Sequence, residues 1–241
     1  MAKSWGSTKG STTSDKIDYM KFKNGKQTVR VVSGVEARYV YWPKNKDDKT
    51  APFDCLRFDR DNERFIQGAK DPVQDLGLID PKTKEPLKCK KNYVCWVIDR
   101  ADNKLKVMQV KDGILKGIQS TMSQLEIEDP SMIDITIVRT GSSWNDTEYS
   151  VEPITAMKFL GAVTKEGTPE YNLHQADKEL LGEDMEKVKD LREMFPIQSY
   201  DEQRTALEGF MEGRQDKKEG GTDNEAAATA NDAEAASDLD D

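Results

Sequence analysis

The stretch NYVCWVIDRADNKLKVMQVK, residues 92–111, decides how the rest of the chain can fold. On both sides of the polar segment 99–103 the side chains alternate with a period of two, and β-branched and aromatic residues are frequent. Such alternation around a turn-forming segment is typical of two antiparallel strands joined in a hairpin. The chain is therefore predicted to be organised around a β-hairpin.

Aromatic rings and cations lie close together in this hairpin and in one earlier segment. The hairpin region contributes Lys88, Lys90, Lys91, Tyr93, Trp96, Lys104 and Lys106. The segment EARYVYWPKNK contributes Arg38, Tyr39, Tyr41, Trp42, Lys44 and Lys46. Flat rings beside cations suit the bases and phosphates of a single-stranded nucleic acid. The alternative is that the rings belong to the core and the lysines to a solvated face.

Further elements are predicted on both sides of the hairpin. Strands are expected over residues 28–33, 36–42, 133–140 and 147–151, and a helix over 112–125 with Asp112 as its N-cap. This order suits a mostly β fold with helical additions, namely an OB-fold-like small Greek-key barrel with a long insertion and C-terminal helices. An SH3-like barrel and an α+β sandwich are the alternatives.

Composition divides the chain into four parts. Residues 1–15 are expected to be a flexible arm, and residues 16–160 an OB-like nucleic-acid-binding core that contains the irregular insertion 47–91. Residues 161–214 are predicted to be a helical extension, with one helix over 175–195 and a second that begins with a capping box from Ser199 to Glu202. Residues 215–241 are predicted to be a disordered acidic tail.

The net charge of -9 conceals an uneven distribution. Residues 1–111 carry 24 Lys/Arg against 15 Asp/Glu, whereas residues 112–241 carry 12 against 30. Charge distribution is a better guide to an anionic partner than the total, so the strand-bearing half remains a candidate for nucleic-acid binding. An acidic tail can dock on a basic partner or compete with nucleic acid for a basic groove, or it can simply keep the chain soluble.

Several classes of protein are excluded or disfavoured. Glycine-rich phosphate loops, HExxH and GxSxG are absent, so a binding protein is expected rather than an enzyme. The sequence has no run of 18 apolar residues and no apolar segment near its start, which predicts no membrane span and no export. Three free thiols are then expected in a reducing cytoplasm, that of the host cell if the chain is viral.

The sequence offers possible ligands for a metal ion but does not predict a metal site. Cys55, Cys89, Cys95 and His174 could supply four ligands, but their spacing matches no common zinc pattern. The expectation is therefore no metal and no cofactor.

Four stretches resemble the phage replication single-stranded-DNA-binding proteins of the helix-destabilising type. They are FKNGKQTVRVVSGVEARYVYWPKN (22–45), KNYVCWVIDRADNKLKVMQVKDGILKGI (91–118), DITIVRTGSSWNDTEYSV (134–151) and the acidic end ASDLDD. The resemblance implies an OB-fold core, cooperative and sequence-independent binding of single strands, self-association on DNA, and a C-terminal tail that contacts replication and recombination proteins. Many members also carry a cysteine-rich zinc subdomain in the insertion, where this chain retains only Cys55 and Cys89.

Carried onto this sequence, the resemblance assigns roles to particular residues. The stacking candidates are Tyr39, Tyr41, Trp42, Tyr93, Trp96 and, at the tip of a turn, Trp144. The phosphate-binding candidates are Arg38, Lys44, Lys46, Lys88, Lys90, Lys91, Lys104, Lys106 and Arg139. The partner-binding candidates are Asp238, Leu239, Asp240 and Asp241.

The expected function is sequence-independent binding and protection of single-stranded DNA during phage replication, recombination and repair. Two alternatives stay open. One is an acidic adaptor that binds a basic protein with its helices and tail. The other is binding of single-stranded RNA, because stacking and phosphate contacts do not distinguish the sugar.

Overall fold

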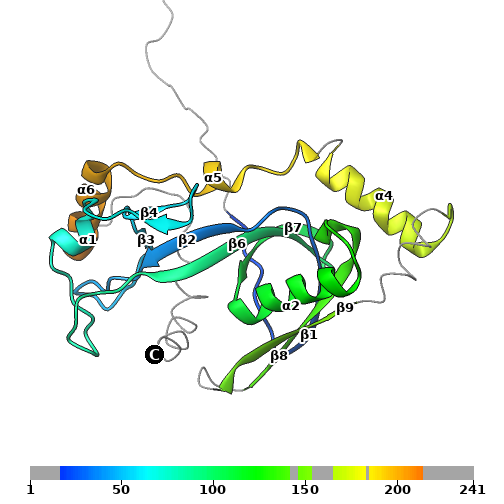
Figure 1. Cartoon of the computed structure of the whole chain (residues 1–241), viewed down its shortest axis with the longest axis horizontal. Coiled ribbons are helices and arrows are strands. Elements are labelled where there is room, and N and C mark those ends of the chain that lie inside the picture. Colours follow the sequence, from blue (N-terminus) through cyan, green and yellow to red (C-terminus); the bar gives the residue numbers. More distant parts are fainter. Residues whose placement is uncertain (1–16, 142–145, 154–164, 183–184, 214–241) are drawn as a thin grey trace, which may run out of the picture.

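The structure, a computed structural model, describes residues 17–141, 146–153, 165–182 and 185–213 (Figure 1). Its main element is an antiparallel sheet of seven strands in the order β3-β2-β6-β1-β8-β9, with β7 paired to β6. The strands are β1 Gly25–Val31, β2 Glu36–Tyr41, β3 Phe53–Asp54, β6 Lys90–Asp99, β7 Lys104–Val110, β8 Asp134–Thr140 and β9 Glu148–Pro153. The predicted hairpin is confirmed as β6 and β7.

Strand β6 lies at the centre of this sheet. Along one edge it pairs with β2 near its start and with β1 near its end, and along the other edge it pairs with β7. Between β1 and β2 the chain stays attached to β6, because the Val32 amide donates to the Trp96 carbonyl and the Trp96 amide donates to Ser33 Oγ at 2.8 Å. β1 and β2 therefore act as one interrupted strand beside β6.

The mostly β fold with helical additions is confirmed, but the sheet is not closed into a barrel. Among the described residues β9 pairs with β8 and with no other strand. Helix α2, Asp112–Gln124, instead packs against β9 and covers the core formed by β1, β6, β7 and β8. A Cβ atom on Gly117 would lie 2.6 Å from Val151 Cγ2, so only glycine allows this close approach. The OB-like barrel is not confirmed.

Helix α2 begins close to its predicted start. Lys111 is its N-cap and makes no side-chain capping bond, so the prediction of Asp112 as N-cap is wrong by one residue. Asp112 lies in the first turn, where a carboxylate is favoured by the partial positive charge of the helix end. A 3-10 turn, η1 Pro130–Met132, then leads into β8.

The insertion contains short elements rather than one long loop. Strands β4 Phe58–Asp59 and β5 Arg64–Phe65 form a two-stranded sheet. Helix α1 Pro72–Asp75 is capped by Asp71, whose carboxylate accepts from the backbone amides of Val73 and Gln74. Helix α6, Tyr200–Met211, packs against the insertion and buries Leu207 completely in the same apolar cluster. The predicted capping box of α6 is confirmed, since Ser199 and Glu202 bond reciprocally.

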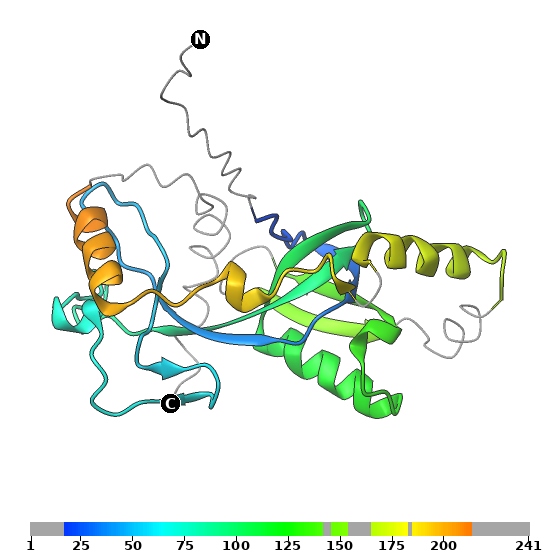
Figure 2. The same ribbon diagram turned by 90° about the horizontal axis from the view of Figure 1, so that it is seen from above.

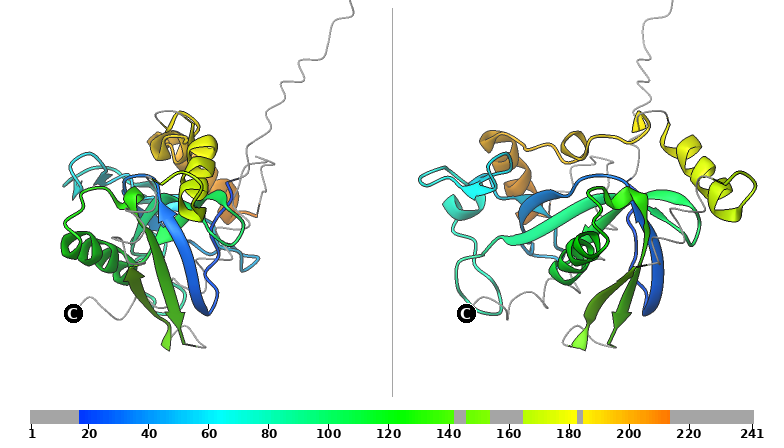
Figure 3. Two further views of the ribbon diagram at one scale, coloured as in Figure 1. Left: turned by 90° about the vertical axis from the view of Figure 1, so that its right-hand side faces the viewer. Right: turned by 45° about the vertical axis from the view of Figure 1, so that its right-hand side comes forward.

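The helix predicted over 175–195 is interrupted. Helix α4, Pro169–Leu181, stops at Gly182, whose φ of +82° is a left-handed value that glycine tolerates. A short helix, α5 Leu191–Met194, follows within the segment 185–199, which we call the C-terminal strap. Figures 1 and 2 show the strap crossing over β6 from α4 towards α6, and Figure 3 shows it on the opposite side of the sheet from α2.

The strap and α4 are integral to the fold. Leu191 and Phe195 of the strap are 7% and 6% exposed, and they pack against Trp96 and its neighbours on β6. Such burial of large apolar side chains contributes roughly 1.5–3 kcal/mol each. The helical extension therefore belongs to the same packed unit as the sheet. In the part of the chain described, no helix is long and apolar enough to span a membrane.

A buried ion cluster fastens α4 to the sheet. Arg30 of β1 and Arg100 after β6 each pair with Asp134 of β8 and with Asp177 of α4, at nitrogen–oxygen distances of 2.7 to 2.9 Å. The four side chains are between 3% and 10% exposed. Burial alone would lower the pKa of Arg100, but hydrogen bonds to Asp177 and Asp134 outweigh this effect and raise it. The cluster therefore pairs two guanidinium groups with two carboxylates.

Replacing Asp177 with asparagine should destabilise the protein strongly. The substitution leaves Arg30 and Arg100 with one buried carboxylate between them, and removal of one partner from a buried ion pair costs about 3–5 kcal/mol. Urea unfolding followed by circular dichroism measures the change. Glu179→Gln, which removes an exposed carboxylate from the same helix, is the control and should stay within about 0.5 kcal/mol. Equal effects of the two substitutions would contradict a stabilising role for the cluster.

Candidate nucleic-acid interface

Aromatic and cationic side chains meet on one face of β2 and β6. The strand register places Tyr39 opposite Lys91 and Ala37 opposite Tyr93, and directly opposed residues share a face of a sheet. Lys91 Nζ lies 4.5 Å from the centroid of the Tyr93 ring. The pKa of Lys91 is raised, chiefly by hydrogen bonding with the Tyr93 side chain, so this exposed amine remains a cation.

The insertion adds two rings to this face. Tyr39 packs on Phe58 with ring centroids 4.5 Å apart and on Phe65 at 4.8 Å, the latter edge-on. Phe58 is buried, whereas Phe65 is 47% exposed. We call Tyr39, Phe58, Phe65, Lys91 and Tyr93 the aromatic–basic face. It offers partly exposed ring surfaces beside a fixed positive charge, which are the two elements required to stack bases and hold phosphates.

More cations gather where β6 begins. The pKa of Lys90 is lowered, first by burial and also by the nearby charges of Lys82 and Lys111, while Asp80 opposes this effect. Lys82, Lys90 and Lys111 therefore lie close enough together at this end of β6 for their charges to interact, with the Asp80 carboxylate nearby.

Three predicted interface residues lie in the protein interior instead. Tyr41 is 1% exposed, within 3.5 Å of Cys55 Sγ, and burial raises the pKa of its hydroxyl. Trp96 is 7% exposed, and its Nε1 donates to the Lys189 carbonyl at 2.7 Å. Arg38 is 4% exposed, pairs with Asp54, and lies over the Phe195 ring at 4.2 Å. Covered rings and paired guanidinium groups cannot contact a nucleic acid in this conformation.

Two more predicted cations have structural partners. Lys106 pairs with Asp99 at 2.8 Å and with Asp102 at 2.9 Å across the hairpin turn. Arg139 donates from Nη1 to the Phe22 carbonyl at 3.0 Å and is half-buried. Lys104 is exposed, but it lies at the turn end of the hairpin, at the opposite end of β6 from Lys91. The structure does not bring these three together with the aromatic–basic face.

The remaining predicted residues lie at the surface around the insertion. Lys44 pairs with Asp48 at 3.0 Å, Lys88 pairs with Glu85 at 3.2 Å, and Trp42 is half-buried. Lys46 is exposed and lies against Gly213, where the described part of the chain ends. Trp144 and the tail residues Asp238, Leu239, Asp240 and Asp241 lie outside the described residues.

The sequence pattern does not predict every residue at or near the aromatic–basic face. Phe58 and Phe65 stand in a region without periodicity, where the sequence offers only isolated aromatic residues. Their pairing across β4 and β5, which directs both rings towards Tyr39, depends on the turn between them. Lys82 and Lys111 were also missed, because nothing local shows that a turn of the insertion and the start of α2 both approach Lys90.

The cysteines of the insertion lie in packed surroundings. Cys55 and Cys89 lie in the apolar cluster beside Tyr41, and Cys95 is buried in the main core. Within residues 17–141, 146–153, 165–182 and 185–213, no group of three or more His, Cys, Asp or Glu side chains could hold a metal ion. The thiols of the insertion therefore contribute to packing.

Comparison with known proteins gives a clear relative. No family model matches the chain. The chain is 48% identical to the "Probable ssDNA-binding protein" of Escherichia phage T5 over an alignment of 259 positions that covers 100% of both proteins. Identity of this extent, without truncation of either sequence, shows common ancestry and a common fold. The chain therefore belongs to the family of this phage T5 protein.

Proposed function

We propose that this chain is a phage single-stranded-DNA-binding protein, and that it binds DNA through the aromatic–basic face. The observation that carries the proposal is the joint placement of Tyr39, Phe65, Tyr93 and Lys91 on one side of the sheet. The 48% identity to a protein named for single-stranded-DNA binding supports it. Neither observation involves a catalytic group, so we infer a binding protein rather than an enzyme.

The proposed mechanism uses two kinds of contact with the strand. Bases stack on the exposed ring surfaces, each at roughly 1–3 kcal/mol, without regard to base identity, because every base has a flat π-face. Phosphates are held by Lys91 and by the lysines near the start of β6, with release of counterions. Single-stranded RNA offers the same features and is the second candidate ligand.

We propose that the acidic tail competes with DNA for the basic surface and recruits partner proteins. Residues 215–241 carry 2 Lys against 9 Asp/Glu, and Gly213, just before them, lies beside Lys46. A polyanion attached at this position can occupy the basic surface when DNA is absent and become available to replication or recombination proteins when DNA displaces it.

Replacing Phe65, which is 47% exposed, with alanine should weaken binding of oligo-dT about tenfold, because it removes a stacking surface. Fluorescence anisotropy of a labelled oligonucleotide measures the affinity, and urea unfolding checks that the fold is retained. Ile79→Ala is the control, since Ile79 is 57% exposed and is not part of the aromatic–basic face. Unchanged affinity of the Phe65 variant would remove this ring from the site.

Replacing Lys91 with glutamine should make binding less sensitive to salt. Each phosphate contact on a single strand contributes about -0.7 to the slope of log K against log salt concentration, so the slope should flatten by roughly that amount. Titrations at four salt concentrations measure it. Lys104→Gln removes the same charge at the far end of β6 and should leave the slope unchanged. If both variants flatten the slope equally, the charge acts at long range rather than by contact.

Removing residues 215–241 should raise the apparent affinity for oligo-dT at low salt and have little effect at high salt, where screening weakens the competition. The same anisotropy titration, performed on the full chain and the shortened one, measures the difference. An unchanged affinity at low salt would contradict competition by the tail.

A further inference from the structure

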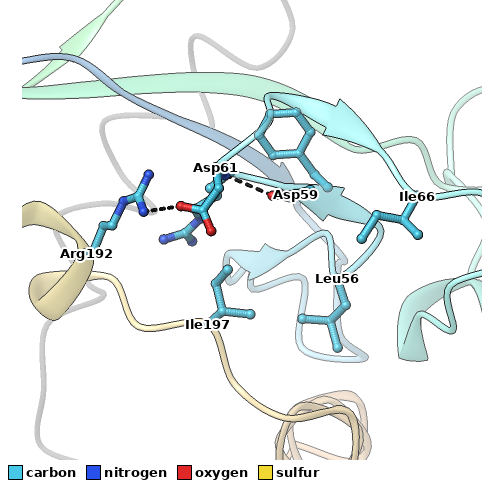
Figure 4. A pocket seen from close by; sticks show the side chains of 8 residues that line it. Leu56, Asp59, Asp61, Ile66, Arg192 and Ile197 are labelled. Carbon is cyan, nitrogen blue, oxygen red and sulfur yellow. Dashed lines mark hydrogen bonds and ion pairs between the residues drawn. The ribbon is translucent and has the colours of Figure 1, made fainter.

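A pocket of about 410 Å³ lies between the insertion and the C-terminal strap (Figure 4). Its apolar walls come from Leu56, Phe58 and Ile66 of the insertion and from Ile197 of the strap. Ile66 is 45% exposed and Ile197 is 52% exposed, so the walls are open to solvent. The volume falls in the range of about 300–1,000 Å³ that is usual for small-ligand sites.

The pocket adjoins the aromatic–basic face through one shared side chain. Phe58 lines the pocket and also packs on Tyr39 at 4.5 Å and on Phe65 at 5.4 Å. Ile66, on the pocket wall, directly follows the exposed Phe65. Phe58 is thus a wall that the two share, and a strand whose bases stack on Tyr39 and Phe65 must pass round the edge formed by the insertion for one further base to enter the pocket.

One side of the pocket carries a carboxylate and a guanidinium next to each other. Arg192 of the strap donates to the Asp61 carboxylate, as the dashed line in Figure 4 marks. Their side chains are 49% and 75% exposed, so both retain capacity for a ligand. Arg192 Nε also donates to Glu36 at 3.2 Å, which limits where the guanidinium can lie.

The other two charged residues of the lining are occupied within the protein. Asp59 accepts from the backbone amides of Asp61 and Asn62, which fixes the turn of the insertion. Arg60 donates to the Phe195 carbonyl at 2.6 Å and to Asp54 at 2.8 Å, which joins the insertion to the strap. Asp61 and Arg192 are therefore the pair available to a ligand.

We propose that this pocket takes one base of the bound strand and prefers guanine. The inference rests on the proposed function of single-strand binding. The apolar walls meet the flat faces of the base. Guanine presents two adjacent N–H donors, N1 and N2, to the Asp61 carboxylate, and two acceptors, O6 and N7, to the Arg192 guanidinium. Thymine presents one N–H donor between two carbonyls, and adenine and cytosine each present one amino group, so each makes fewer bonds with the pair than guanine does.

The preference for guanine in the pocket acts in addition to the sequence-independent contacts. Stacking and phosphate contacts continue to hold any strand, and a guanine that reaches the pocket fixes the position of the protein along it. An apolar side chain from a protein partner is the competing occupant. Such a side chain would use the walls but would not need the Asp61–Arg192 pair, so base preference separates the two.

The test compares two labelled oligonucleotides of about 16 nucleotides, oligo-dT and the same strand with one central guanine, by anisotropy with the full chain. Wild-type protein should bind the guanine strand about tenfold more tightly. Inosine, which lacks the N2 amino group, should lose most of this gain. Asp61→Asn should bring the ratio of the affinities for the guanine strand and oligo-dT close to one. Its affinity for oligo-dT should stay within about twofold of the wild-type value.

Asp48→Asn is the matched control. It removes one carboxylate of 84% side-chain exposure from the same insertion, outside the pocket, and should keep the guanine preference. Equal wild-type affinities for the two strands overturn the inference, and so does a preference that survives Asp61→Asn. A wild-type protein that binds neither strand overturns the proposed function itself, which distinguishes the two failures.

Discussion

Strand β6 is the constraint on which the rest of the structure depends. It is paired along both edges, and most of its length is buried on both faces, with Cys95 and Val97 in the core under α2 and Val94 and Trp96 under the C-terminal strap. Because side chains alternate along a strand, a shift by one residue would exchange these two sets and place each against the wrong neighbours. The register fixed by this burial also determines where Tyr93 and Lys91 emerge, beyond the covered part of the strand.

Local periodicity was sufficient to predict the strands around β6, the helix after the hairpin and the capping box of α6, because each depends on residues close in sequence. It could not show which face of β6 is covered. Tyr93 and Trp96 are three residues apart and must point to opposite faces, but the cover over Trp96 comes from the strap, about ninety residues later. For the same reason the sequence predicts Arg38 in the interface, although its guanidinium group lies over the Phe195 ring of the strap.

The candidate site was predicted only in part because half of it belongs to the insertion. Tyr39, Tyr93 and Lys91 lie on regular strands, where alternation assigns them to a common face. Phe58 and Phe65 reach the same face through a short two-stranded element, and Asp61 and Arg192 meet only because the strap passes beside that element. Contacts between segments without periodicity depend on tertiary packing and leave no local pattern in the sequence. The closed barrel is likewise not confirmed: among the described residues β9 pairs with β8 alone, and α2 packs against β9.

The order of the strap and its flanking helices, after the sheet that they cover, has a consequence for biosynthesis. Asp177 completes the charge balance of Arg30 and Arg100, Phe195 covers one face of β6, and Leu207 fills the core of the insertion. A ribosome delivers these residues after the sheet, so the emerging chain carries an open apolar surface until they follow. Chains released by termination before Asp177 would keep this surface exposed and aggregate or be degraded.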